Sequence, residues 1–281
     1  MASLRSMFSV GLGVMSSSFL NTVSLNVYSF VIGAYYNLSQ LGCYTQADKW
    51  SKMGITSFSQ IVTSSFLPVL SGFQDDKERL LRAMRKMNRF AAYLLFPTFL
   101  LLITVAEPIF HILFGTKWDE AIVLFQILVA RGIFLVLTSL YNNYILAIGR
   151  SKALVSYEIV KDVLMVAAIC VTIPYGVTEM IWGQFAASGL FYVYALVFTG
   201  HVTGYRVRNI VGDVLPYFFI ALLVACCQLA VGAWLSNAWL SLLVQSAVCV
   251  VVYYGINRLL RSNIQREVLT YAFGRFRKNK A

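Results

Sequence analysis

The chain has 281 residues, of which 59% are hydrophobic, 15% aromatic and 12% charged, whereas roughly 25% of residues are charged in an ordinary soluble domain. This composition excludes a soluble globular protein. The net charge of +11 would suggest a nucleic-acid partner in a soluble chain, but the basic residues here lie in short clusters beside apolar segments, where they indicate membrane topology. We therefore expect no nucleic acid to bind.

Eight apolar segments, taken in chain order, predict eight transmembrane helices, because a helix needs about 20 apolar residues to cross a bilayer. They cover residues 9–34, 54–73, 91–114, 121–147, 153–174, 177–199, 214–235 and 237–257. The expected fold class is an all-α polytopic membrane protein. The connections are mostly short and carry turn residues or charges, so they leave no room for a folded soluble domain.

Lysine and arginine are distributed unequally between the two sides of this predicted topology. The termini and the even-numbered connections hold 18 of the 23 basic residues, and the odd-numbered connections hold Lys49, Lys52 and Lys117. Because cytoplasmic loops accumulate Lys and Arg, we expect both termini in the cytoplasm. The two remaining basic residues, Arg131 and Lys161, lie within predicted spans.

Two basic segments, 75–89 and 258–281, have an amphipathic pattern. Apolar residues recur at helical spacing in both, namely Leu80, Leu81, Met84 and Met87 in the first and Leu260, Ile264, Val268 and Tyr271 in the second. Either segment would suit a helix lying on a leaflet, with anionic membrane lipids as its partners. The alternative is a solvated extension of a membrane helix. Asp75 or Asp76 is expected to cap the start of the first segment.

The sequence contains none of the patterns that mark a common enzyme or metal site. There is no glycine-rich phosphate loop, no GxSxG motif and no His-Cys metal spacing. The five cysteines form no CxxC pair, and four of them lie inside apolar segments. We therefore expect no catalytic activity, no metal and no cofactor.

Ionisable residues inside predicted spans are candidate functional residues, because they cost several kcal/mol unless they face a partner or water. Arg131 lies near the middle of the fourth span, and Glu158, Lys161 and Asp162 share one face of the fifth. Arg131 and Lys161 would attract an anionic group, whereas Glu158, Asp162 and Glu107 would balance charge or couple to a proton or cation. The alternative for the cluster on the fifth span is an internally neutralised packing site.

Hydroxyl and amide side chains are also frequent in the predicted spans. They could line a water-filled cavity, with Asn21, Asn26, Ser29, Gln60 and Asn142 as candidates. The more common role of such side chains is to join neighbouring helices by hydrogen bonds.

Four segments resemble the Wzx-type polysaccharide flippases of the MOP (MviN/MATE-like) superfamily. They are VIGAYYNLSQLGCYTQADKW (31–50), PVLSGFQDDKERLLRAMRKMNR (68–89), AEPIFHILFGTKWDEAIVLFQIL (106–128) and ILAIGRSK (145–152). The first contains the family's Ile-Gly and Leu-Gly-x-Tyr, the second its Pro-x-Leu-Ser and Gln-Asp-Asp, and the third its Ala-Glu-Pro and Gly-x-x-Trp. The order and spacing of the four segments agree with the family.

The resemblance implies a transporter of the bacterial cytoplasmic membrane that passes an undecaprenyl-diphosphate-linked oligosaccharide to the outer leaflet by alternating access. Residues 1–205 would form the second of two six-helix lobes, 206–257 two additional helices and 258–281 a basic tail. The first lobe would then be missing, so we expect a fragment, a truncated reading frame or one half that needs a partner. Many family members carry Asp and Asn where this chain has Tyr28 and Ser29.

Two other functions stay open from the sequence. A MOP-type or unrelated cation-coupled exporter of small molecules could use intramembrane acids such as Glu158 and Asp162. A membrane enzyme of polysaccharide assembly is the other alternative, although a polymerase would favour a large extracytoplasmic loop, which the predicted topology lacks.

Overall fold

The computed structural model of the protein describes residues 26–72, 76–235, 237–260 and 264–265, and within them it contains helices and no β-strand. Residues 26–35 are helical. The longer elements that follow are α2 (Leu38–Ser71), α3 (Lys77–Thr104), α4 (Ala106–Phe114), α5 (Asp119–Ala147), α6 (Ser151–Thr172), α7 (Val177–Thr203), α8 (Val207–Gly232) and α9 (Ala238–Leu259). The candidate Asn21 and most of the basic tail lie outside the described residues.

Helix α2 begins well before the predicted residue 54, so the expected loop over 35–53 is wrong from Leu38 onward. Asn37 starts the helix as its N-cap, because its side-chain oxygen accepts a hydrogen bond from the Gln40 backbone N–H at 2.8 Å. Further along, Lys52 and Asp48 form an ion pair at 2.6 Å with i,i+4 spacing, which suits a helix. Hydropathy alone therefore marks only the apolar second half of α2.

The predicted third span, 91–114, is divided between two helices. Helix α3 begins at Lys77, where Asp76 accepts a hydrogen bond from the Arg79 backbone N–H at 3.0 Å. The amphipathic basic segment is therefore an extension of a membrane helix, the second of the two alternatives. Helix α3 ends at Thr104 and α4 begins at Ala106, because Pro108 has no N–H for the Thr104 carbonyl and its ring would clash with that group.

The remaining helices lie close to their predicted ranges, except that α8 begins at Val207 rather than 214. Five helical segments are long and apolar enough to cross a membrane: Glu78–Thr104, Thr116–Ala147, Val177–Thr203, Val207–Gly232 and Ala238–Leu259. That count covers the described residues. Helices α2 and α6 have the required length but carry more polar and charged residues. The fold is thus an all-α multi-pass membrane bundle, and the number of eight spans stays a prediction.

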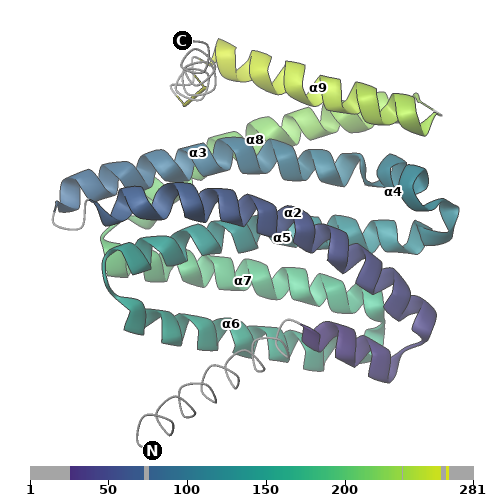
Figure 1. Cartoon of the computed structure of the whole chain (residues 1–281), viewed down its shortest axis with the longest axis horizontal. Coiled ribbons are helices and arrows are strands. Elements are labelled where there is room, and N and C mark those ends of the chain that lie inside the picture. Colours follow the sequence, from purple (N-terminus) through teal and green to yellow (C-terminus); the bar gives the residue numbers. More distant parts are fainter. Residues whose placement is uncertain (1–25, 73–75, 236, 261–263, 266–281) are drawn as a thin grey trace, which may run out of the picture.

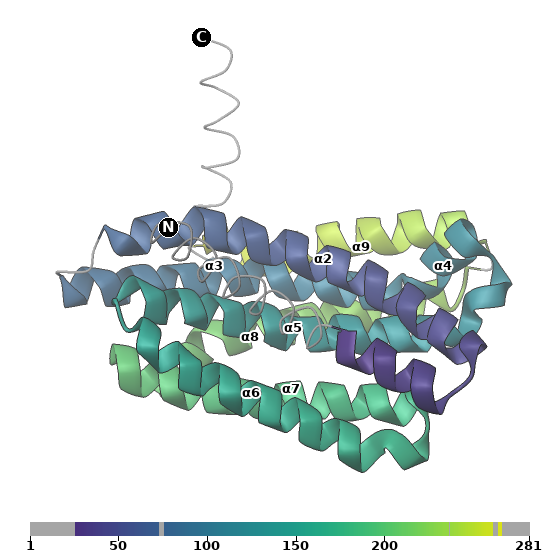
Figure 2. The same cartoon turned by 60° about the horizontal axis from the view of Figure 1, so that its bottom comes forward.

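The helices run side by side along one long axis, from α9 at one edge of the bundle to α6 at the other (Figures 1 and 2). The long helices alternate in direction along the chain, and the short α4 follows α3 at the same end of the bundle. The end of α2, the start of α3 and the connections 148–150 and 204–206 therefore lie at one end, which we call the basic end. The connections 36–37, 115–118 and 173–176, the end of α8 and the start of α9 lie at the other, the opposite end (Figure 1). This alternation is the one that the sequence predicts. Which end faces the cytoplasm stays a prediction.

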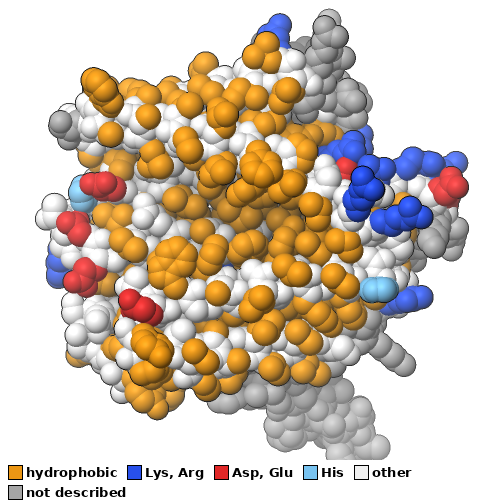
Figure 3. All heavy atoms as spheres, turned by 180° about the vertical axis from the view of Figure 1, so that it is seen from behind, with side chains coloured by type: hydrophobic (Ala, Val, Ile, Leu, Met, Phe, Trp, Pro, Cys, Tyr) orange, Lys and Arg blue, Asp and Glu red, His pale blue; other side chains and the backbone are white. Residues whose placement is uncertain are grey.

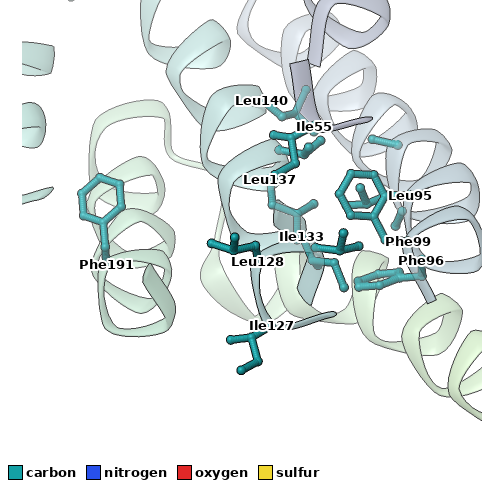
Figure 4. Close-up of a cluster of buried hydrophobic side chains, with 14 of the residues drawn as sticks. Ile55, Leu95, Phe96, Phe99, Ile127, Leu128, Ile133, Leu137, Leu140 and Phe191 are labelled. Atoms are coloured by element: carbon teal, nitrogen blue, oxygen red, sulfur yellow. The ribbon is translucent and has the colours of Figure 1, made fainter. Parts of the chain in front are cut away.

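Helix α5 is the centre of the bundle, since it packs against α2, α3 and α7. Its buried side chains meet Ile55 from α2 and Phe99 from α3, while Phe191 lies on α7 across from them (Figure 4). Helix α8 packs on α3, and α9 packs on α8 and α4. A residue in the middle of α5 is therefore surrounded by protein on several sides.

Gly132 permits the close approach of three helices at this centre. A Cβ atom added there would lie 2.6 Å from Ile55 Cγ1 and 2.8 Å from Phe99 Cε1. We expect Gly132→Ala to lower the free energy of unfolding by about 1–3 kcal/mol through overpacking, partly offset by the higher helix propensity of alanine. Reversible unfolding in mixed micelles would measure it, with Gly212→Ala as the control, because a Cβ there meets no atom within 4 Å. Equal stability of the two variants would contradict this account.

Candidate substrate-binding site

Arg131 lies near the middle of α5 and is partly buried. Its Nε–H donates a hydrogen bond of 3.0 Å to the Ser188 hydroxyl of α7. Ser188 is itself buried, and its hydroxyl donates to the Gln184 carbonyl one turn earlier at 2.9 Å. The guanidinium is thus held at Nε by a neutral side chain, and its terminal nitrogens form no hydrogen bond with the described residues. Those nitrogens are the groups that bind phosphate in a bidentate manner.

Three side chains from the first part of the described chain interact electrostatically with Arg131. They are Tyr28, Tyr44 and Asp48. Asp48 is buried in the first half of α2 and forms the ion pair with Lys52. We call these three residues, with Arg131 and Ser188, the Arg131 cluster. The sequence prediction missed the acid, because Asp48 was assigned to a loop. Its i,i+4 spacing to Lys52 was the signal that could have placed it on a helix.

The Tyr28 hydroxyl is a further polar group beside this arginine. It is buried and has no hydrogen-bond partner among the described residues. A buried polar group without a partner costs about 1–3 kcal/mol, so this hydroxyl is expected to bond to water, to a ligand or to another part of the protein. Tyr28 occupies one of the two positions where the family resemblance would place an acid or an amide.

The predicted cluster on α6 is paired within itself. Lys161 forms an ion pair with Glu158, and Asn142 of α5 donates to Glu158 Oε1 at 3.4 Å. Asp162 is exposed and lies outside this pair. Asn142 is 11 residues beyond Arg131, or about 16 Å along the helix axis at 1.5 Å per residue. The structure therefore does not join Lys161 to the Arg131 cluster, and it favours the internally neutralised alternative.

The other candidate residues differ in exposure and in the helix that carries them. Glu107 is exposed at the start of α4, at the opposite end of the bundle, and Gln60 is exposed on α2. Asn26 is exposed and Ser29 partly buried on the helix before α2. Asn142 has a buried side-chain oxygen without a partner among the described residues. These side chains come from four different helices, and their role in lining a cavity stays a prediction.

A second polar network, which the sequence did not predict, ties α8 to α3 near the basic end. Arg85 and Arg89 of α3 both contact the Asp213 carboxylate of α8, at 3.1 and 2.6 Å. The Tyr205 hydroxyl also donates to Asp213, at 2.6 Å. Burial and this hydrogen bond raise the pKa of Tyr205 above its ordinary value, so the hydroxyl stays protonated. Asp213 is only 2% exposed, and two guanidinium groups face its carboxylate.

Charge is distributed along the bundle axis in the pattern that the sequence predicts. Seen from behind, hydrophobic side chains cover a broad middle band, Lys and Arg gather at the basic end, and several Asp and Glu lie at the opposite end (Figure 3). Large apolar side chains are exposed on α6, α7, α8 and α9, for example Val163, Leu190, Leu223 and Val250. This surface fits a bilayer around the apolar band, and the cytoplasmic position of the basic end stays a prediction.

The comparisons with known proteins point to one family. A family profile described as "Polysaccharide biosynthesis protein" matches residues 1–123. The succinoglycan biosynthesis transport protein ExoT of Rhizobium meliloti (strain 1021) is 25% identical over 274 residues, which are 96% of this chain and 55% of that protein. The lipopolysaccharide biosynthesis protein WzxC of Escherichia coli (strain K12) is 22% identical over 218 residues, covering 78% and 40%.

A solved structure shares the fold. The lipid II flippase MurJ, in an inward closed conformation, superposes with a TM-score of 0.71 at 14% identity, over 94% of this chain and 56% of that one. This chain spans about half the length, or less, of the relatives that it matches. The matches confirm the resemblance to MOP-type polysaccharide flippases that the sequence motifs indicate, and they confirm the flippase-like fold.

Proposed function

We propose that this chain, whose fold and relatives are those of MOP-type polysaccharide flippases, is one lobe of a transporter that passes an undecaprenyl-diphosphate-linked oligosaccharide across the bacterial cytoplasmic membrane. Residues 1–205 form the lobe, 206–257 two additional helices and 258–281 a basic tail, with both termini cytoplasmic. A further set of helices, on the same or another chain, completes the transporter. The protein acts by alternating access and not as an enzyme.

One observation carries this proposal: a guanidinium group in the middle of a central helix whose terminal nitrogens have no hydrogen-bond partner in the described structure. An arginine at the centre of a span costs at least about 2.5–3.5 kcal/mol on insertion scales, so it needs water, an acid or an anion. Asp48 balances part of the charge, and Ser188 fixes Nε. The two terminal nitrogens of the guanidinium have no hydrogen-bond partner among the described residues, and their planar fork is suited to a diphosphate.

Asp48 also supports a second candidate function, cation-coupled export of small molecules. It is a buried acid beside a cation, which is the arrangement that proton- or cation-coupled transporters use within the membrane. Asp48→Asn separates the two functions, because a coupling acid is required for turnover whereas a balancing acid is needed only to position Arg131. Under the flippase proposal this variant keeps part of its export activity.

Export in a flippase-deficient bacterium tests the proposal. We expect the chain expressed alone not to restore surface polysaccharide, and co-expression with the first six-helix lobe of a related flippase to restore it at least in part. Immunoblots of the membrane fraction control for abundance in both strains. Full restoration by this chain alone would contradict the one-lobe proposal, and efflux of drugs instead of glycan would favour the second candidate.

A further inference from the structure

A cavity of about 420 Å³ lies at the opposite end of the bundle, between α4, α8 and the start of α9. Its volume is within the range of small-molecule sites, roughly 300–1,000 Å³. The wall combines polar side chains, Thr104, Glu107, His111, Ser241 and Gln245, with apolar ones such as Pro108 and Leu229. It is separate from the Arg131 cluster, and none of its residues belongs to that cluster.

The Gln245 side chain is the main polar group of this wall. It is 4% exposed, and its Oε1 atom has no hydrogen-bond partner among the described residues. Its amide is fixed on the other side, because Nε2 donates to the Ser241 hydroxyl at 2.7 Å. The amide also lies directly against Gly232, where an added Cβ would be 2.5 Å from Nε2. A buried, oriented acceptor without a donor is costly, and it predicts a ligand that donates.

The charges of the wall restrict the ligand. Glu107 adds a carboxylate to the wall. The Nε2 atom of His111 already has a partner, because it lies 2.9 Å from Asp119 Oδ1. The Glu107 carboxylate in the wall, together with Asp119 behind His111, opposes the binding of phosphate and other anions. The available groups, an amide oxygen and a carboxylate, accept hydrogen bonds, while Pro108 and Leu229 offer apolar surface. Hydroxyl groups on a partly apolar ring match both properties.

We infer that this cavity binds a neutral sugar residue, with Gln245 Oε1 and Glu107 accepting hydrogen bonds from its hydroxyl groups. The inference goes beyond the proposed function, because it assigns a second site that does not use Arg131 and that recognises the glycan and not its lipid diphosphate. Gly232 leaves the space that the Gln245 amide needs.

Saturation-transfer NMR on the intact chain tests this site. The protein is placed in lipid nanodiscs free of glycoside detergent, since a maltoside head group would compete. The probes are methyl β-D-glucopyranoside and methyl β-D-galactopyranoside, with inorganic pyrophosphate and tetramethylammonium chloride as comparators. We expect saturable transfer to at least one glycoside at millimolar concentrations, and none to pyrophosphate.

Three variants show whether the binding occurs in this cavity. Gln245→Leu and Gly232→Ala should each weaken glycoside binding about fivefold to tenfold, the effect of one lost hydrogen bond. Gly212→Ala on the same helix is the matched control and should bind like the unmodified protein, because its Cβ meets nothing within 4 Å. If either buried variant does not fold, Glu107→Gln at the exposed rim should still weaken binding.

Absence of transfer to both glycosides would overturn the inference, as would glycoside binding that Gln245→Leu and Glu107→Gln leave unchanged. Stronger binding of tetramethylammonium than of the glycosides would assign the cavity to a cation and would overturn it as well. None of these results bears on export through Arg131, so the two proposals can fail separately.

Discussion

Replacing Arg85 and Arg89 together by Met is expected to lower the free energy of unfolding by about 3 kcal/mol, because the carboxylate of Asp213 is then left buried without a cation. Asp213 is 2% exposed, whereas the two arginine side chains are 44% and 42% exposed. Because the two arginines are partly exposed, we place the expected loss of stability at the lower end of the range for breaking a buried ion pair. Reversible unfolding in mixed micelles would measure it.

Replacing the acid instead of the two arginines should lower the free energy of unfolding by less. Asp213→Asn keeps a hydrogen-bonding side chain for the Tyr205 hydroxyl and leaves two arginines that already reach water, so we expect a loss of about 1 kcal/mol. Adding Asp213→Asn to the double arginine variant should recover part of its lost stability. A triple variant no more stable than the double variant would show that the arginines act by packing and not by compensating the buried charge.

In the assembled two-lobe transporter, Arg131→Ala is expected to reduce glycan export by roughly tenfold to a hundredfold, the loss of one or two charge-assisted hydrogen bonds to the diphosphate. Arg131→Lys should have an intermediate effect, because an ammonium keeps the charge but cannot contact a phosphate in a bidentate manner. Export per molecule of membrane-inserted protein is the measurement.

Lys161→Gln provides the matched control, since Lys161 is the other basic residue within a predicted span but is paired with Glu158. We expect this variant to export nearly as well as the unmodified protein. Normal export by Arg131→Ala at equal abundance would make Arg131 a structural partner of Asp48 and Ser188. A severe defect in Lys161→Gln alone would instead place the anion near α6.

Hydrophobic segments predicted most of the helices and their alternation between two ends, because apolar length and charge placement are local properties of the chain. They did not predict that α2 begins at Leu38, since its first half is polar and is stabilised by the Asn37 cap and the Asp48–Lys52 pair. They also joined α3 and α4, where Pro108 ends the regular hydrogen bonding. Local polar interactions decide such boundaries, and a hydropathy pattern does not contain them.

Arg131 was predicted as a candidate from the cost of its burial alone, but its partners were not. Ser188 is 57 residues away in sequence, and Asp213 is 124 residues from Arg89. Such pairs depend on which helices pack together, and short-range spacing cannot reveal them. The same spacing suggested that Glu158, Lys161 and Asp162 act as one group, whereas the described ion pair joins only Glu158 and Lys161, and Asp162 is exposed.

Lipid binding by the assembled transporter tests the central claim most directly. Native mass spectrometry of the purified two-lobe protein, incubated with equal amounts of undecaprenyl diphosphate and undecaprenol, reports whether the anionic head group is recognised. We predict preferential retention of the diphosphate by the unmodified protein, and loss of that preference in Arg131→Ala but not in Lys161→Gln. Equal retention of the two lipids by the unmodified protein, or an unchanged preference in Arg131→Ala, would contradict the assignment of Arg131 to the diphosphate.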